Sequence, residues 1–507
     1  MFSSVLSFGI RGIEGFCVNV EADISDGMPM FELVGYLSGE VKEARERVRT
    51  ALKNTGYDFP VKRITLNLSP GNVRKQGTGY DLPMAVAILA AMGEIDREKL
   101  NETMIIGELK LNGDVGRING VLPMVICGRK TGIKRCIVPA ANAAEGAMVN
   151  GVEIIPVSNL KEAADHLKGT VPIRPHTRDG NAVEASDNNA GCDLKYVRGQ
   201  AAARRGLEIA ACGMHNMLMV GAPGAGKSML AKCIPTILPP LSDEEALEVS
   251  SIYSVAGLLK DDRNLMKERP FISPHHTVTD IAMTGGGTYP RPGSISLSHR
   301  GVLFLDEMPE FSRYTLEVLR QPLEDRKITI ARNFGTYVYP ADFMLVGAMN
   351  PCPCGAYPDL SKCTCTEPSR RRYLSRLSRP LLDRMDICVD VMKLGYDDML
   401  SSEMSESSDR VRERVIRTQE IQKDRFSGEK ILFNSQMGSD EIHKYCALEP
   451  KVKGWFAGAL EKLDVSARGY TKILKVARTI ADLDGLKAIG REHLAEAIQL
   501  NNSYIMG

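Results

Sequence analysis

The stretch MLMVGAPGAGKSMLAK, residues 217–232, decides the fold of this 507-residue chain. Four apolar residues that predict a buried strand lead directly into a glycine-rich loop, and a stretch that predicts a helix follows. The loop has the spacing G-x-x-x-x-G-K-S, which in a strand–loop–helix context binds nucleotide phosphates through backbone N–H groups and the helix N-terminus. We therefore expect bound ATP, with phosphate contacts from the loop and a Mg²⁺ contact from its serine, made by Gly221, Gly224, Gly226, Lys227 and Ser228.

Two more apolar segments end in polar residues that suit ATP hydrolysis. Val302–Leu305 ends at Asp306 and Glu307, and Met344–Met349 ends at Asn350. In a doubly wound parallel sheet the carboxyl ends of the strands face one crevice. We expect Asp306 to join the Mg²⁺ shell and Glu307 to orient and deprotonate the attacking water. Asn350 either positions that water or only caps a turn.

The remaining chain divides by pattern into segments. Alternating residues 61–68 predict a half-buried strand, and apolar residues 84–92 predict a helix that Asp81 caps. A polar, Ser-rich stretch precedes the charged segment 409–426, which favours a solvated helix carrying i,i+4 ion pairs. We predict a mixed α/β domain, a linker, a doubly wound parallel-sheet core, a polar segment with a charged helix, and a helical lid, at residues 1–170, 171–193, 194–398, 399–430 and 431–507.

Composition narrows the class of protein only modestly. Lys and Arg total 64 against 63 Asp and Glu, so net charge gives no hint of a nucleic-acid partner. The longest apolar run, Met84–Met92, is too short to cross a bilayer, and the first residues lack the pattern of a signal peptide. We expect a cytoplasmic protein without a membrane partner, whose twelve cysteines are mostly reduced.

Four of these cysteines form the unusual pattern C-x-C-x8-C-x-C. Four thiolates on one short loop suit a tetrahedral, structural Zn²⁺ site. Free thiols, a redox disulfide and an iron–sulfur cluster remain alternatives. The candidate ligands are Cys352, Cys354, Cys363 and Cys365.

The long spacing between Lys227 and Asp306 indicates an insertion around residues 255–295, with an exposed loop or hairpin. Within it, we expect His275 and His276 to be hydrogen-bonded structure rather than ligands. Residues 328–338 alternate and turn near Asn333, which predicts a second hairpin. Its Arg332 either contacts a nucleic-acid backbone or belongs to a plain surface hairpin.

The run Gly301–Glu307, with residues 290–299 before it, resembles the magnesium-chelatase-like branch of AAA+ ATPases. The whole chain resembles the YifB/ComM family. This resemblance implies a ring, a homo-hexamer, with ATP between subunits and Asn350 as sensor 1. It also implies that Arg384 is the arginine finger offered to a neighbour and that Arg468 is sensor 2 in the lid.

Through residues 75–81 and 107–113 the N-terminal domain is similar to the proteolytic domain of Lon proteases, an α+β fold like that of ribosomal protein S5. Those enzymes use a Ser-Lys dyad. The two dyad positions align here with Gly79 and Leu122, which supply neither a nucleophile nor a base. We therefore expect no peptidase activity.

For the substrate of the ATPase, three hypotheses remain: a DNA motor, a chelatase-like motor on a metal-inserting partner, and a protein unfoldase. Members of the ComM type are understood to drive branch migration in natural transformation, which favours single-stranded or branched DNA. The resemblance also implies that the chelatase subunit lacks this N-terminal domain. An arginine cluster with a candidate stacking ring either binds DNA phosphates or forms an inter-subunit contact; it comprises Arg370, Arg371, Arg372, Arg376, Arg379 and Tyr373.

Overall fold

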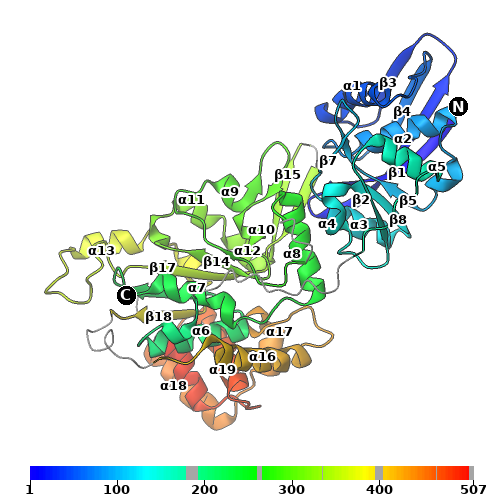
Figure 1. Cartoon of the computed structure of the whole chain (residues 1–507). Coiled ribbons are helices and arrows are strands. Elements are labelled where there is room, and N and C mark those ends of the chain that lie inside the picture. The colour runs from blue at the N-terminus through cyan, green and yellow to red at the C-terminus, as the bar shows by residue number, and fades with distance from the viewer. Residues whose placement is uncertain (178–191, 260–264, 334, 394–403, 464, 502–507) are drawn as a thin grey trace.

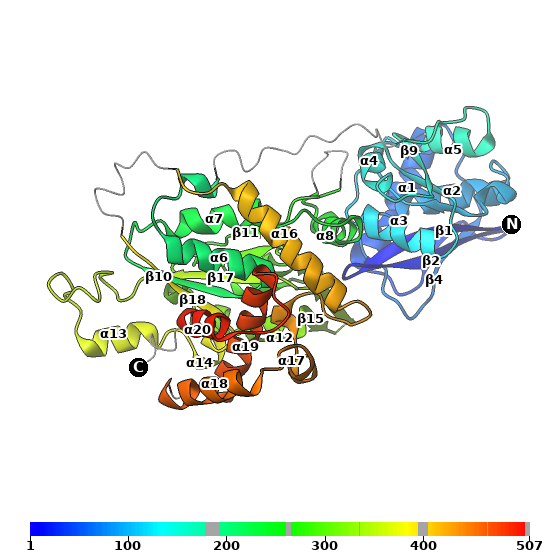
Figure 2. The ribbon, with the colours of Figure 1, turned by 90° about the horizontal axis from the view of Figure 1, so that it is seen from below.

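The computed structural model describes residues 1–177, 192–259, 265–333, 335–393, 404–463 and 465–501. Parts of the predicted linker and polar segment, residues 178–191 and 394–403, lie outside the described residues. The N-terminal domain sits at one end of an elongated molecule, beside the larger core and its helical lid (Figures 1 and 2).

The N-terminal domain is built on a mixed sheet with strand order β3–β4–β2–β1–β5–β8–β9. Helix α2 packs on β1 and β2, and α3 also packs on β2. The strands are β1 (Phe2–Arg11), β2 (Glu14–Ser25), β3 (Met30–Val34), β4 (Arg63–Ser69), β5 (Thr103–Ile105), β8 (Arg135–Pro139) and β9 (Glu153–Val157), with the small pair β6 (Glu108–Leu109) and β7 (Val115–Gly116). The helices are α1 (Gly39–Asn54), α2 (Asp81–Met92), α3 (Val121–Lys130), α4 (Ala143–Gly146) and α5 (Leu160–Lys168).

The strand expected at residues 61–68 is β4, and its alternate residues are buried as its pattern predicted. The helix expected at residues 84–92 is α2, but the prediction that Asp81 caps it is wrong. The helix begins at Asp81 and Tyr80 holds the cap position. The buried Asp81 carboxylate instead accepts hydrogen bonds from Arg47 Nε at 2.7 Å and Nη2 at 3.0 Å. An ion pair across the domain therefore takes the place of a local cap.

The core is a parallel sheet with strand order β11–β14–β17–β10–β18, consistent with a P-loop AAA+ fold. Successive side chains of β10 alternate between two hydrophobic clusters. Met217 and Met219 face α6, α7 and the lid, whereas Leu218 and Val220 face the insertion and the hairpin. The strands are β10 (Met217–Gly221), β11 (Phe271–Ile272), β14 (Val302–Leu305), β17 (Met344–Met349) and β18 (Ile387–Val391). The core helices are α6 (Ala201–Gly213), α7 (Lys227–Ile237), α8 (Asp243–Ala256), α11 (Arg313–Glu317), α12 (Arg320–Asp325), α13 (Glu367–Leu374) and α14 (Arg379–Leu382).

The expected insertion contains a hairpin, one of the two expected alternatives, but Gly285, Pro290 and Pro292 in it are buried rather than exposed. The insertion also supplies the sheet strand β11, which no sequence pattern indicated. The hairpin pairs β12 (Gly285–Gly286) with β13 (Arg291–Pro292), between α9 (Asp280–Thr284) and α10 (Ser294–Leu297). The second predicted hairpin is β15 (Lys327–Arg332) and β16 (Gly335–Pro340). The two hairpins are in contact, since the Tyr339 hydroxyl donates to Pro290 O at 2.6 Å.

The lid packs on the core through helix α16, the charged segment. Its helices are α16 (Ser408–Arg425), α17 (Ser439–Tyr445), α18 (Pro450–Leu463), α19 (Ala467–Leu483) and α20 (Arg491–Leu500). The solvated face expected for α16 is present at Arg410, Glu413 and Arg417, and one ion pair lies within the helix, between Arg412 and Asp409 at 2.9 Å, three residues apart rather than four. Two other arginines of α16 depart from the expected i,i+4 pattern. Arg414 pairs instead with Glu208 of α6 at 2.5 Å, and Arg425 pairs with Asp482 of α19. The first pair joins α16 to helix α6 of the core, and the second joins two helices of the lid.

The N-terminal domain contacts the core at two places. Helix α3 packs against α8 through apolar side chains, and Ser254 Oγ donates to the buried Glu145 carboxylate at 2.5 Å. At the second place, Arg11 Nε donates to Thr336 O at 3.1 Å, and Gln76 Nε2 donates to the Tyr337 hydroxyl at 3.1 Å. The tip of the β15–β16 hairpin is therefore bonded to the N-terminal domain.

Candidate nucleotide site

The glycine-rich loop joins the end of β10 to the start of α7. Gly224 and Gly226 have φ values of 74° and 96°, which favour glycine. No heavy atom lies within 4 Å of where a Cβ would stand at either residue. The loop is therefore open above two backbone positions where phosphates would approach, directly before the N-terminus of α7.

Lys227 is 8% exposed and is held by three acceptors. Its Nζ donates to Gly221 O at 2.7 Å, to Ala222 O at 3.0 Å and to Asn350 Oδ1 at 3.1 Å. Burial lowers the pKa of Lys227, and the negative charges of Asp306 and Glu307 partly oppose that shift. The structure thus brings the lysine and the asparagine of two separate motifs into direct contact.

Ser228 and Asp306 also meet, as the motif spacing predicted. Ser228 Oγ donates to Asp306 Oδ2 at 2.6 Å, and the N–H of Glu307 donates to Asp306 Oδ1 at 2.9 Å. A hydroxyl and a carboxylate so placed are oxygen ligands of the kind that Mg²⁺ takes beside phosphates.

Glu307 stands at the tip of β14 with its side chain 60% exposed and its backbone in the left-handed region at φ 49°. His276 Nδ1 lies 3.9 Å from Glu307 Oε2, while the neighbouring His275 Nδ1 hydrogen-bonds the Thr277 hydroxyl at 2.9 Å. No sequence pattern connected His276 with this site. Its position just after β11, which is adjacent to β14 in the sheet, would have indicated that it lies near Glu307. Strand β11 itself was not predicted, so this contact was not predicted either.

Arg384 and Arg468 line one cavity of about 210 Å³ between core and lid. Arg384 pairs with Glu324, and Arg468 Nη1 lies 3.2 Å from Asp383 Oδ2. The Asn216 amide donates to Arg384 O at 2.9 Å. Asn216 precedes β10, whereas the glycine-rich loop follows it. A five-residue strand spans about 16 Å, so Arg384 is held at the opposite end of β10 from the phosphate loop of its own chain.

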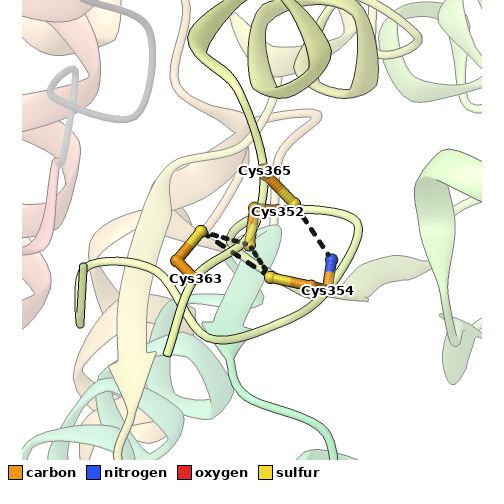
Figure 3. Close-up of side chains that lie close together, drawn as sticks. All are labelled: Cys352, Cys354, Cys363 and Cys365. Atoms are coloured by element: carbon orange, nitrogen blue, oxygen red, sulfur yellow. Dashed lines mark hydrogen bonds between the residues drawn. The ribbon is translucent and has the colours of Figure 1, made fainter. Parts of the chain in front are cut away.

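The four cysteines lie together in the segment after Asn350, as Figure 3 shows. Their sulfur atoms all lie within 4.8 Å of one another, and all four are free thiols. Hydrogen bonds, the largest from the backbone of Ala356, lower the pKa of Cys354 to about 6. The cluster thus offers four convergent sulfur ligands.

The arginine cluster starts on α13, which projects from the core on the side away from the N-terminal domain (Figures 1 and 2). Arg371 and Arg372 are exposed, but Arg376 pairs with Glu310 at 2.7 Å, just after β14. Tyr373 is only 7% exposed and packs in the core, so its proposed role as a stacking ring is wrong. The burial of Tyr373 could not be predicted from the sequence, because its neighbours in the segment are mostly arginines.

At the two positions aligned with the Lon dyad, Gly79 lies against Ile118, and the side chain of Leu122 is fully buried in the apolar cluster that joins α3 to α8. Among the described residues, no helix is long and apolar enough to span a bilayer.

The glycine-rich loop, its buried lysine, and the pair formed by a hydroxyl at the start of α7 and a carboxylate at the end of β14 define a P-loop ATPase site. Three family profiles cover most of the chain: "Magnesium chelatase, subunit ChlI" at residues 193–399, "Subunit ChlI of Mg-chelatase" at 20–142, and "Magnesium chelatase, subunit ChlI C-terminal" at 405–501. The chain belongs to the YifB/ComM family of magnesium-chelatase-like AAA+ proteins, and this family implies ATP hydrolysis with Mg²⁺.

Among its relatives, the uncharacterized protein YifB of Escherichia coli K12 is 42% identical over 490 residues, which cover 96% of this chain and 94% of that protein. The competence protein ComM of Haemophilus influenzae Rd is 41% identical over 499 residues, covering 97% and 96%. The peroxisomal Lon protease homolog 2 of Oryza sativa subsp. japonica is 27% identical over 176 residues, covering 31% of this chain and 20% of that protein. The profile at residues 20–142 names a chelatase subunit, so the N-terminal domain does not by itself argue against the chelatase hypothesis.

Proposed function

We propose that the protein is a ring-forming ATPase, a homo-hexamer, that translocates on single-stranded or branched DNA and so drives helicase or branch-migration activity. The observation that carries the ATPase part is the convergence of Lys227, Ser228, Asp306 and Asn350 above one loop. What favours DNA is the near full-length similarity to a relative named a competence protein.

In the hydrolysis step, Lys227 gives up its hydrogen bonds to backbone oxygens and binds the β- and γ-phosphates instead. Its hydrogen bond to Asn350 holds the Asn350 side chain beside the γ-phosphate. Ser228 and Asp306 would hold Mg²⁺, which when bound would stabilise charge on the phosphates. Glu307 accepts the proton of the attacking water. Its neighbour His276 is placed to orient the carboxylate.

The two arginines serve the nucleotide of a neighbouring subunit. Arg384 is anchored at the far end of β10 from its own loop, and Arg468 lines the same cavity. An arginine side chain is much shorter than this strand, so Arg384 does not reach its own phosphate loop in this arrangement, and Arg468 pairs with the neighbouring Asp383. This geometry supports a ring in which each ATP lies between a loop from one subunit and arginines from the next.

Exposed basic groups favour DNA contact at α13 and at the β15–β16 hairpin. Arg371 and Arg372 project from α13, and Arg332 is exposed near the hairpin tip. The family profiles favour a second candidate, a chelatase-like ATPase that remodels a protein partner, with an unfoldase as a related form.

The deciding experiment measures ATPase activity with and without single-stranded and Holliday-junction DNA, and DNA binding by Glu307→Gln with ATP. Stimulation and ATP-dependent binding are expected. Replacing Arg371 and Arg372 with Ala removes two phosphate contacts and flattens the salt dependence of binding by about 1.4 in log–log slope. Replacing the exposed Arg410 and Arg417 of α16 is the matched control. If DNA neither stimulates nor binds, the chelatase-like function becomes the better account.

We also propose that the N-terminal domain has no peptidase activity, since Gly79 lacks a nucleophile and Leu122 is buried among apolar groups. Covalent labelling by a serine-hydrolase probe would contradict this. As a cofactor besides ATP and Mg²⁺, we propose one structural Zn²⁺ on Cys352, Cys354, Cys363 and Cys365.

A further inference from the structure

We infer that this metal controls nucleotide binding: a Zn²⁺ on the four cysteines braces the phosphate loop from the side of Asn350. The inference rests on the proposed function, in that the loop must bind nucleotide. It extends that function by making the metal a structural requirement of the ATP site rather than of the fold.

The sulfur positions suit a tetrahedral ion. Zn–S bonds of about 2.3 Å place neighbouring sulfurs about 3.8 Å apart. The Cys352–Cys354, Cys352–Cys363 and Cys354–Cys363 sulfur distances are 3.4, 3.8 and 3.6 Å. Cys365 completes the set, and its Sγ accepts from the N–H of Cys354 at 3.4 Å. On binding, the thiols release their protons and the four sulfurs bond to the ion.

The metal would cross-link a loop that is anchored at both ends on one residue. The segment leaves the sheet at Asn350 and returns through α13, where Tyr373 is buried; burial raises the pKa of Tyr373, and the backbone N–H of Asn350, which points toward the Tyr373 oxygen, partly opposes that shift. Asn350 in turn accepts from Lys227 of the phosphate loop. Any change of shape between residues 351 and 372 is therefore transmitted to the side chain that contacts the P-loop lysine.

A second contact reaches the phosphate loop directly. Gly355 is buried, has φ 77°, and packs on Pro223: a Cβ there would lie 2.2 Å from Pro223 Cδ and 2.7 Å from Cγ. The N–H of Gly355 donates to Cys352 O at 3.0 Å, so one ligand residue sets its position. The thiol loop, residues 351–366 with the four cysteines, thus contacts the phosphate loop through the backbone of Gly355 and the ring of Pro223. There is no room for a side chain between them.

Apolar burial does little to hold the thiol loop in place. Pro353, Tyr357 and Pro358 are exposed, and Leu360 is 76% exposed. A loop with so little buried surface needs another constraint to pay for its ordering. Four metal–sulfur bonds supply that constraint, and the two contacts carry it to Lys227 and Pro223.

The test combines metal analysis with affinity for a fluorescent ATP analogue. Full-length protein is expected to contain about one Zn²⁺ per chain. Removing it by chelation, or by Cys363→Ser, should weaken nucleotide binding about tenfold, the usual scale of coupling between sites. Re-addition of Zn²⁺ should restore the affinity of the chelated protein.

Gly355→Ala tests the contact with Pro223 separately from the effects of losing the metal and of losing the fold. It should keep the zinc and weaken nucleotide binding, because the new methyl group meets Pro223. Gly428→Ala is the matched control, since Gly428 has a similar φ of 85° with no atom within 4 Å of a Cβ. It should leave affinity unchanged.

Protein that lacks zinc as purified, or zinc-stripped and Gly355→Ala proteins that bind nucleotide like wild type, would overturn the inference alone. Wild-type protein that contains zinc but binds no nucleotide would overturn the proposed function as well.

Discussion

The placement of Arg384 predicts that two inactive variants restore activity when mixed. One variant is Arg384→Ala, which keeps its own phosphate loop and Glu307 but offers its neighbour no finger. The other is Glu307→Gln, which offers the finger but cannot activate water. Each protein alone should lose ATPase activity by about 10³-fold or more, the range for a lost arginine finger.

The size of the recovery follows from the geometry. If Arg384 acts only on the next subunit, a site is intact when its loop comes from an Arg384→Ala chain and its finger from a Glu307→Gln chain. Random mixing in equal amounts gives this arrangement at about one interface in four of a head-to-tail ring, whatever the ring size. The mixture should therefore recover about a quarter of wild-type activity if the sites fire independently.

The assay is steady-state phosphate release after the two proteins are mixed in conditions that exchange subunits, across a range of ratios. Activity should peak at the equal mixture. Should every ratio stay at the level of the separate variants, although exchange is verified, Arg384 acts on the site of its own chain or not at all. The inference from its anchor on Asn216 would then be wrong.

Three further results are expected. His276→Ala should lower kcat with little change in KM, because it leaves the phosphate contacts intact and releases a carboxylate; an unchanged kcat in a steady-state assay would remove this residue from the site. Burial raises the pKa of Glu248, but His299 and Arg300 outweigh it and hold that pKa at about 2, below the ordinary 4.5. Its stabilising contribution is present above pH 4.5 and lost as pH falls toward 2, so Glu248→Gln should flatten the acid limb of unfolding measured by denaturant. Asp81→Asn weakens the charge-assisted hydrogen bonds to Arg47 and should cost about 1.5–3 kcal/mol of N-domain stability, because Arg47 stays partly in water and burial already raises the pKa of Asp81; a thermal melt that matches wild type would contradict this.

The strands of the candidate nucleotide site could be predicted because an apolar run stands directly before each polar motif. The apolar runs before Gly221, Asp306 and Asn350 are β10, β14 and β17, and their order in the sheet brings the polar tips together. Strand β11 could not be predicted in the same way, because a two-residue strand has no periodicity. His276, which follows that strand, was therefore not connected with Glu307.

Other failures come from partners that are distant in sequence. Asp81 had the position of a helix cap, but Arg47 on another helix takes its carboxylate. Arg414 and Arg425 had acidic neighbours in their own helix, but they pair with α6 and α19. Local pattern identifies which residues are charged, and only the packing of helices decides which opposite charge is nearest.

The bonds from Arg11 and Gln76 to the β15–β16 hairpin limit how that hairpin can move. If the hairpin travels against the core during the ATPase cycle, its tip either carries the whole N-terminal domain with it or breaks two hydrogen bonds, at about 1 kcal/mol each. The domain also packs on α8 through α3. If the domain moves with the hairpin, this second contact must shift as well. The two hydrogen bonds and the α3–α8 contact would then together limit how far the hairpin can move before one of them breaks.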